Sequence, residues 1–151
     1  MPDNILLISI KPNYADRIFK GEKTVELRRV KTKLITGDIV LVYVTSPKKA
    51  LIGYFEVKEV IVIENLKDNL NKFWQQVKNY ACIKRPEFKS YYQGASTGVA
   101  IFINNPHLFN SSIELQTLKQ KLPNFHPPQS YHYLNPEKTN IVEAIAGCKL
   151  L

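Results

Sequence analysis

The residues with the clearest chemical potential lie between Gly21 and Arg29, a stretch that reads Gly-Glu-Lys-Thr-Val-Glu-Leu-Arg-Arg. Gly21 can end a helix, and the alternation that follows it predicts a strand over residues 24–30. Apolar and polar side chains alternate along this strand, and the polar ones share a face: Lys23 at its start, then Thr24, Glu26 and Arg28. An acid, several bases and a hydroxyl are therefore expected side by side.

These side chains permit recognition or catalysis. Arg28 can present a planar fork to a phosphate or to the edge of a base, and Lys23 can pair with an acid or bind phosphate. Glu26 can accept hydrogen bonds from an exocyclic amine such as that of cytosine, or act as a general base. The alternative is an edge strand whose charged face is solvated and ion-paired, with no ligand at all.

The composition is that of a globular protein with an excess of positive charge. The chain has 151 residues, and 21 Lys and Arg against 13 Asp and Glu give a formal net charge of +8. Such an excess favours polyanionic partners, most commonly nucleic acid. The sequence shows no membrane-length apolar run and no signal-peptide pattern, and Cys82 and Cys148 have no metal-ligand spacing. We therefore expect a single cytoplasmic domain over residues 1–151 that makes no membrane contact.

Strands are predicted where β-branched and apolar residues run between turn signals, and helices where the apolar period lengthens to three or four residues. The predicted strands cover residues 5–10, 24–30, 39–45, 50–63 and 96–103, and the predicted helices cover 13–20, 65–81, 86–92, 112–121 and 136–146. Closely spaced strands with short turns indicate a small mixed or antiparallel barrel, α+β in class. We expect the barrel core at about 5–64 and 96–104, with helical additions at about 65–93 and 111–146.

Local signals set expectations within these elements. Asn65 is a predicted helix N-cap, and Ser111 or Ser112 is predicted to cap a later helix. Gly53, inside a strand, predicts a bulge or a close approach of another backbone. Asn104-Asn105-Pro106 is predicted to end a strand, and the proline-containing segment 124–135 is predicted to be an extended loop.

The stretch from Gly21 to Arg28 matches the Gly-x-Lys-x-x-Glu-x-Arg signature of the ASCH (activating signal cointegrator homology) domain family, and the chain resembles that family within the PUA-like superfamily. Other features agree in order: Ser-Ile-Lys-Pro at residues 9–12, Gly37-Asp38 opening a strand, Gly53 in the next strand, and Pro-Pro-Gln-Ser-Tyr at residues 127–131. The resemblance implies a PUA-like mixed β-barrel of five to six strands decorated by helices, with the signature lining a cleft. It also implies RNA binding and, in some members, a nuclease or an amidohydrolase that removes an acyl group from acetylated cytidine. The amidohydrolase type carries a hydroxyl residue where this chain has Glu26, so that nucleophile is missing here.

The leading hypothesis is the binding of single-stranded or modified RNA, or of a nucleotide-like ligand, in a basic cleft. The second is a hydrolase acting on a modified nucleoside or on single-stranded RNA, with Glu26 as general base and Lys23 and Arg28 stabilising the developing anion. The third is an interaction protein whose charged strand is purely structural. Further candidate ligand-binding residues lie on elements that a barrel can bring to the same mouth: Ser9, Lys11, Tyr43, Ser46, Gln129, Ser130 and Tyr131. No metal or cofactor is expected, because the sequence has neither a metal-ligand spacing nor a Gly-rich phosphate loop.

Overall fold

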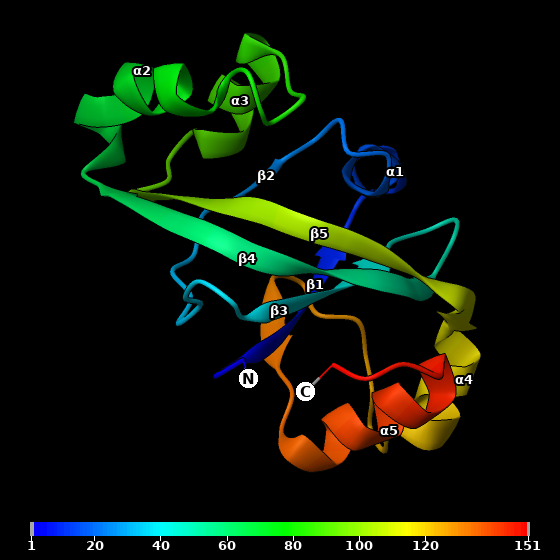
Figure 1. Ribbon diagram of the computed structural model, residues 1–151. Coiled ribbons are helices and arrows are strands. Elements are labelled where there is room, and N and C mark those ends of the chain that lie inside the picture. The colour runs from blue at the N-terminus through cyan, green and yellow to red at the C-terminus, as the bar shows by residue number, and fades with distance from the viewer. Residues whose placement is uncertain (1, 151) are drawn as a thin grey trace.

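A mixed six-stranded sheet, in the order β2-β5-β4-β3-β1-β6, forms the framework of the protein. The computed structural model describes residues 2–150, so the two end residues of the predicted domain lie outside the described part. The strands are β1 (Ile5–Ile10), β2 (Val25–Arg28), β3 (Ile39–Val44), β4 (Ala50–Glu64), β5 (Thr97–Glu114) and β6 (Tyr131–Tyr133). The β1–β3 pair is parallel, and the other four pairs are antiparallel. The sheet curls on itself (Figure 1), which confirms the predicted α+β, barrel-like fold with six strands.

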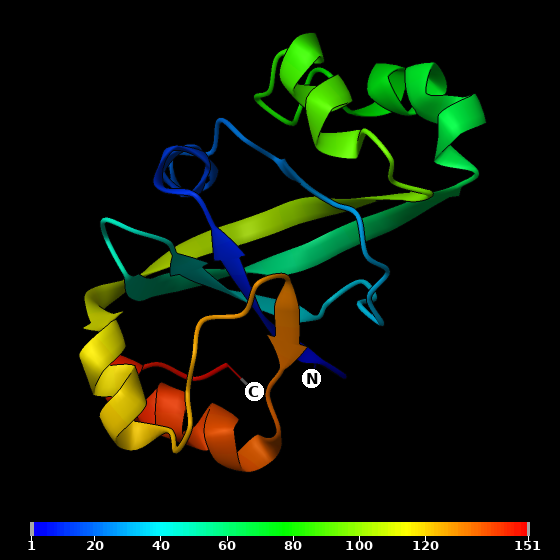
Figure 2. The same ribbon diagram turned by 180° about the vertical axis from the view of Figure 1, so that it is seen from behind.

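Five helices are described, at both ends of the long β4–β5 ribbon and beside it. They are α1 (Pro12–Phe19), α2 (Leu66–Val77), α3 (Arg85–Tyr92), α4 (Leu115–Lys121) and α5 (Pro136–Ala146). Helices α2 and α3 lie at one end of the ribbon and α4 and α5 at the other, as both faces of the molecule show (Figures 1 and 2). Proline occupies the first turn of α1, α3 and α5, where its missing N–H leaves no hydrogen bond unmade. No helix in residues 2–150 has the length and apolarity needed to cross a bilayer.

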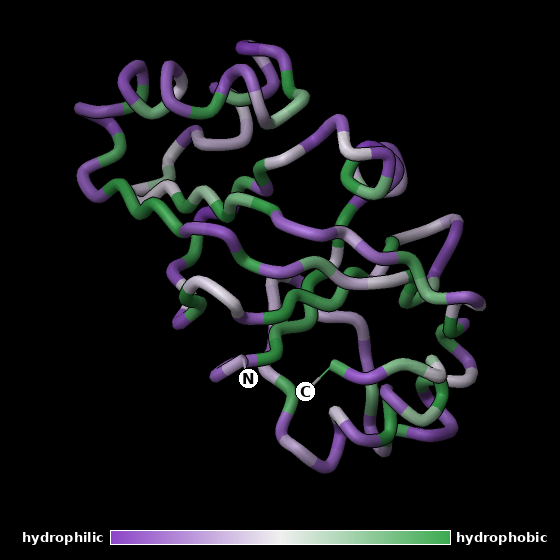
Figure 3. Tube along the Cα trace, in the orientation of Figure 1, coloured by the Kyte–Doolittle hydropathy of each residue, from purple (hydrophilic) through white to green (hydrophobic). Residues whose placement is uncertain are grey.

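The strands bury apolar side chains in three clusters, and the alternation within each strand sends neighbours to different clusters. Side chains such as Ile8, Val42 and Ile101 pack with α1 inside the curl of the sheet. Their neighbours on β1 and β3 pack outward against α4 and α5, and Val25 and Leu27 pack outward against α2 and α3. The apolar character of the central strands is visible in Figure 3. Because Val25 and Leu27 face outward, Glu26 between them faces the inside of the curl.

Side-chain hydrogen bonds join the two edges of the sheet, β2 and β6. Arg28 Nη2 donates to the carbonyl oxygen of Ser130, the residue before β6, at 2.8 Å. The Tyr131 hydroxyl donates to the Lys31 carbonyl at 2.7 Å, and the Lys33 backbone N–H donates to the Tyr133 hydroxyl at 2.5 Å. The curled sheet is thus closed by side chains that reach the segment after β2, in place of a further backbone ladder.

Several predicted element boundaries are wrong. Strand β5 continues through Asn104-Asn105-Pro106 to Glu114, because its pairing with β4 shifts register there and the bulges absorb the proline. Helix α4 consequently begins at Leu115, with no side-chain cap from a serine. Asn65 occupies the N-cap position of α2, but its backbone is left-handed and its side chain makes no capping bond. The 124–135 segment contains the short strand β6, which pairs with β1.

The prediction for Gly53 is confirmed. The β3–β4 register shifts beside it, and a Cβ built at Gly53 would lie 2.3 Å from the His107 carbonyl oxygen on β5. A side chain at this position would clash with the neighbouring backbone, so the close approach of the two strands requires glycine.

Candidate ligand-binding cleft

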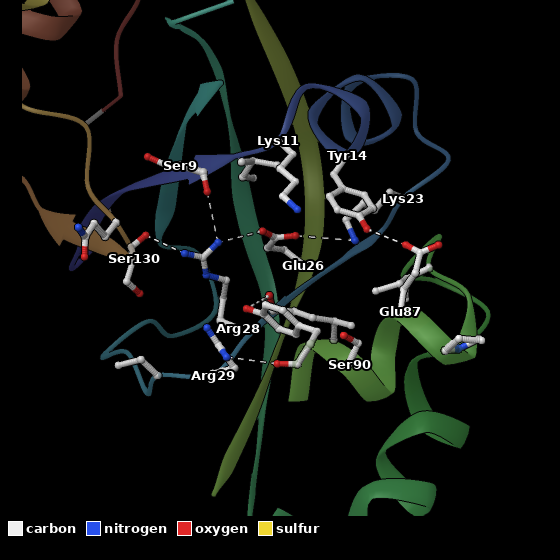
Figure 4. A pocket seen from close by; sticks show the side chains of 17 residues that line it. Ser9, Lys11, Tyr14, Lys23, Glu26, Arg28, Arg29, Glu87, Ser90 and Ser130 are labelled. Atoms are coloured by element: carbon white, nitrogen blue, oxygen red, sulfur yellow. Dashed lines mark hydrogen bonds and ion pairs between the residues drawn. The ribbon is translucent and has the colours of Figure 1, made fainter. Parts of the chain in front are cut away.

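A cleft of about 700 Å³ opens between the start of α1, strand β2, helix α3 and the loop that precedes β6 (Figure 4). Its volume is within the usual range for small-molecule and nucleotide pockets. Seven residues named from the sequence line it: Ser9, Lys11, Lys23, Glu26, Arg28, Gln129 and Ser130. Elements far apart in the sequence therefore meet at this cleft.

Glu26 lies at the centre of an ion network on the cleft wall. It is 6% exposed and points into the cleft between two cations (Figure 4). Its Oε1 lies 3.7 Å from Lys23 Nζ, and its Oε2 lies 3.3 Å from Arg28 Nη1. Antiparallel pairing of Glu26 with Ile101 on β5 fixes this direction, because a one-residue slip would turn Glu26 outward. A carboxylate this buried depends on its cationic neighbours for stability.

Lys23 is the most deeply buried cation of the network, at 3% exposure. Its Nζ donates to the Ala81 carbonyl at 2.6 Å and lies 5.1 Å from the centre of the Tyr14 ring. Burial lowers the pKa of Lys23 below its ordinary value, and the nearby Glu26 carboxylate offsets part of that effect. Lys23 therefore gives up its proton more readily than an exposed lysine.

The Arg28 guanidinium donates hydrogen bonds to two backbone carbonyls and to the Glu26 carboxylate. Nη1 donates to the Ser9 carbonyl and to Glu26, each at 3.3 Å, and Nη2 donates to the Ser130 carbonyl. Ser9 is held in turn by its hydroxyl, which donates to the Pro128 carbonyl at 2.7 Å. Arg28 thus fixes β2, the end of β1 and the loop before β6 relative to one another, and the fork expected to bind a ligand is already occupied.

The rim of the cleft carries cations that are more accessible. Lys11 is exposed, its amine points into the cleft in Figure 4, and it forms no ion pair within residues 2–150. Arg29 lies over the Tyr91 ring, 4.9 Å from its centre, and donates to the Tyr91 carbonyl. Across the mouth, the Tyr14 hydroxyl donates to Glu87 at 3.1 Å and so links α1 to α3.

Four of the sequence-predicted site residues lie away from this cleft. Tyr43 is 2% exposed and packs against Phe125 in the outer cluster with α4 and α5. Ser46 is exposed in the turn after β3, and Tyr131 binds the Lys31 carbonyl at the joined edges of the sheet. Thr24 precedes β2 and does not line the cleft; its backbone N–H donates to the Tyr80 carbonyl. The expectation that these four would meet at the same mouth is wrong.

Five further lining residues with polar side chains were not named as site residues from the sequence: Tyr14, Arg29, Glu87, Ser90 and Tyr91. All but Arg29 belong to α1 or α3, and a short amphipathic helix gives no sign of which polar residues border a cleft. Arg29 lies next to the central stretch, and its position within a basic cluster was the one available signal. Within residues 2–150, no group of three or more His, Cys, Asp or Glu side chains gathers as a metal site would require.

Comparison with known proteins identifies the family. The ASCH domain model matches residues 8–106. The chain belongs to the ASCH domain family. An ASCH domain-containing ribonuclease of Zymomonas mobilis subsp. mobilis is 29% identical over 133 residues, covering 88% of this chain and 86% of that protein.

Solved structures of ASCH from Zymomonas mobilis share the fold of this chain. A crystal structure of ASCH from Zymomonas mobilis superposes with a TM-score of 0.84 at 26% identity, covering 94% of this chain and 95% of that one. A serine-to-alanine mutant of that protein superposes with a TM-score of 0.85 at 26% identity, covering 96% of this chain and 99% of the other. The similarity extends beyond residue 106, so α4, β6 and α5 belong to the shared architecture.

Proposed function

We propose that this ASCH domain binds single-stranded RNA in the cleft between α1 and α3. The observation that carries the proposal is the exposed Lys11 amine, directed into a cleft whose wall is a buried ion network. Four basic side chains and two acidic ones line the cleft, so its formal charge favours a phosphate-bearing ligand. The ribonuclease name of the Zymomonas mobilis relative supports RNA as the polyanion.

The role proposed for each cleft residue follows from the position of its side chain and the contacts that it already makes within the protein. Lys11 and Arg29 lie at the rim and contact phosphates, whereas Arg28 holds the cleft in shape. An unpaired base can stack on the cleft wall against Tyr91 or against the Arg29 guanidinium that lies over its ring, the usual mode of single-strand recognition. Glu26 accepts a hydrogen bond from an exocyclic amine, which would favour cytosine or adenine over uracil.

Lys11→Gln tests this proposal, with Lys58→Gln as the matched control. Lys11 makes no side-chain capping bond to α1, so its loss should leave the fold unchanged. Lys58 is an exposed lysine on β4 that does not line the cleft. Fluorescence anisotropy with a short single-stranded RNA should show weaker binding by Lys11→Gln and a salt slope about 0.7 smaller, the value of one phosphate contact. Equal affinities for Lys11→Gln and wild type, or no binding by wild type, would overturn the proposal.

As a second function, we propose that the domain cleaves the RNA that it binds. The observation that favours cleavage is the position of Lys23, which lines the cleft with its Nζ 3.7 Å from a Glu26 carboxylate oxygen, and burial lowers its pKa. As a free amine, Lys23 can accept the proton of a ribose 2′-hydroxyl that attacks the adjacent phosphate, while the rim cations stabilise the developing charge. The phosphate–5′-oxygen bond then breaks, and the 5′-oxygen takes a proton from water and leaves as a 5′-hydroxyl. The other fragment ends in a 2′,3′-cyclic phosphate.

Cleavage is tested with 5′-labelled single-stranded RNA and the Lys23→Met variant, which keeps the side-chain volume. Wild type should cleave faster as the pH rises, because deprotonation of Lys23 supplies the base. Lys23→Met should bind RNA but not cleave it, and Lys58→Gln, purified in parallel, should cleave like wild type. Undiminished cleavage by Lys23→Met would remove Lys23 from the reaction and point to a contaminating nuclease.

A further inference from the structure

A second groove lies on the other side of α3 and adjoins the RNA-binding cleft. It encloses about 830 Å³ between the start of α2, the second half of α3 and the segment that leads into β5. Ser90 of α3 lines both the groove and the cleft. The next two residues of α3 divide between them, with Tyr91 lining the cleft and Tyr92 the groove. The two hollows therefore meet across one turn of helix.

The charge of this groove has one sign. Lys67 of α2 and Lys89 of α3 both line it, and no acidic side chain does so among the described residues. Both lysines are exposed, and neither makes an ion pair or side-chain hydrogen bond within residues 2–150. Two unpaired cations on facing helices attract an anionic chain that passes between them.

The rest of the lining is uncharged. Leu66, Leu70 and Gln93 border the groove, and the small residues 94–96 leave room beside them, since nothing lies within 4 Å of a Cβ built at Gly94. The Tyr92 ring is buried, and its hydroxyl donates to the Arg28 carbonyl at 2.9 Å, so it offers no stacking face. A surface with two lysines, small residues and leucines but no exposed ring suits phosphate and ribose contacts more than base recognition.

We propose that this groove holds the continuation of the RNA strand whose first nucleotides occupy the cleft. The strand crosses α3 at Ser90, and Lys67 and Lys89 contact its phosphates. This assignment rests on RNA binding in the cleft and extends the length of RNA that the domain contacts. The cleft selects bases, and the groove binds further nucleotides without selecting their sequence.

A length series of RNA oligonucleotides tests the assignment. Strands from about 4 to about 16 nucleotides cover the site sizes of known single-strand-binding folds. Uniform 2′-fluoro RNA lacks the 2′-hydroxyl nucleophile, so strand length stays fixed during the titration. Wild-type affinity should rise with length until both hollows are filled and then level off. The double variant Lys67→Ala/Lys89→Ala should level off at a shorter length.

The salt dependence gives a second, quantitative readout. Loss of two phosphate contacts should lower the salt slope for long strands by about 1.4. Between about 0.05 M and about 0.2 M salt, the advantage of wild type over the variant should then shrink about sevenfold. For the shortest strands, the variant and wild type should bind equally.

The matched control is Lys119→Ala/Lys121→Ala, which removes the same charge from α4 at the far end of the sheet (Figure 1). It should bind long strands like wild type. If short RNA binds and depends on Lys11, but length or Lys67 and Lys89 make no difference, the groove assignment fails and the cleft proposal stands. If RNA of no length binds, RNA binding in the cleft itself fails.

Discussion

Glu26→Gln should destabilise the protein by an amount typical of a broken buried ion pair. The Glu26 side chain is 8% exposed, and its partners Lys23 and Arg28 are 3% and 13% exposed, so solvent compensates little for the lost charge. Removing one partner from such a group costs about 3–5 kcal/mol. The same change in the exposed Lys31–Glu64 pair, Glu64→Gln, should cost less than about 1 kcal/mol and serves as the control.

The cost of Glu26→Gln should also depend on pH, and the sign follows from Lys23. Burial lowers the pKa of folded Lys23 below the ordinary 10.5, and Glu26 opposes that shift, so the variant lowers the pKa further. Between the folded and unfolded pKa values the unfolded chain binds more protons, so stability rises with pH. In Glu26→Gln this pH range begins at a lower pH, because the folded pKa of Lys23 is lower. The difference in the free energy of unfolding between the variant and wild type should therefore shrink as the pH rises towards about 10.5.

Urea unfolding at a series of pH values measures both effects. The single tryptophan, Trp74, packs against Phe88 with ring centres 5.0 Å apart and reports the transition by fluorescence. Adding Lys23→Met to Glu26→Gln removes the uncompensated charge and should recover part of the lost stability. A loss for Glu26→Gln no larger than that for Glu64→Gln, or a pH-independent one, would refute a buried and coupled network.

Three other substitutions probe the frame of the cleft. Gly53→Ala should lower Tm by several degrees, because its Cβ would meet the His107 carbonyl oxygen at 2.3 Å and the two strands must separate; an unchanged Tm would contradict the close approach. Asp38→Ala should cost at least about 2 kcal/mol in urea unfolding, because this 1%-exposed carboxylate accepts four hydrogen bonds that tie the N-terminal residues and the β2–β3 segment. Tyr14→Phe removes only the exposed bond to Glu87 and should cost less than about 1 kcal/mol, whereas Tyr14→Ala also removes the ring beside the buried Lys23 amine and should cost more, as measured by differential scanning calorimetry.

The sequence carried enough information to predict that Glu26 and Arg28 share a face, because their strand alternates strictly between apolar and polar residues. It could not place Tyr43 in the same way. The run Ile39–Val44 is apolar at every position, so both faces are covered and alternation gives no indication of which face meets the cleft. Tyr43 in fact pairs in register with Ser9 on the outward face, where α4 and α5 cover it.

Long-range geometry limited the remaining predictions. Proline at position 106 normally ends a strand, yet the ladder with β4 continues because bulges leave the proline unpaired. The bond from Arg28 to the Ser130 carbonyl joins residues 102 positions apart, and no local pattern encodes it. Local chemistry therefore identified the acid and the bases, whereas tertiary packing determined that the guanidinium would be engaged by backbone carbonyls.

The joined edges of the sheet determine how much of the chain is needed to keep the fold and the cleft intact. A fragment limited to residues 8–106, the extent of the family match, would retain Lys23 and Glu26 but would lose the final strand and cut β5 short. Arg28 would then lack one of its carbonyl acceptors, and the sheet would present unpaired edges that invite self-association. The C-terminal third contributes Gln129 and Ser130 to the lining of the cleft, so transplanting the cleft into another scaffold requires this part as well as the Gly21–Arg28 stretch.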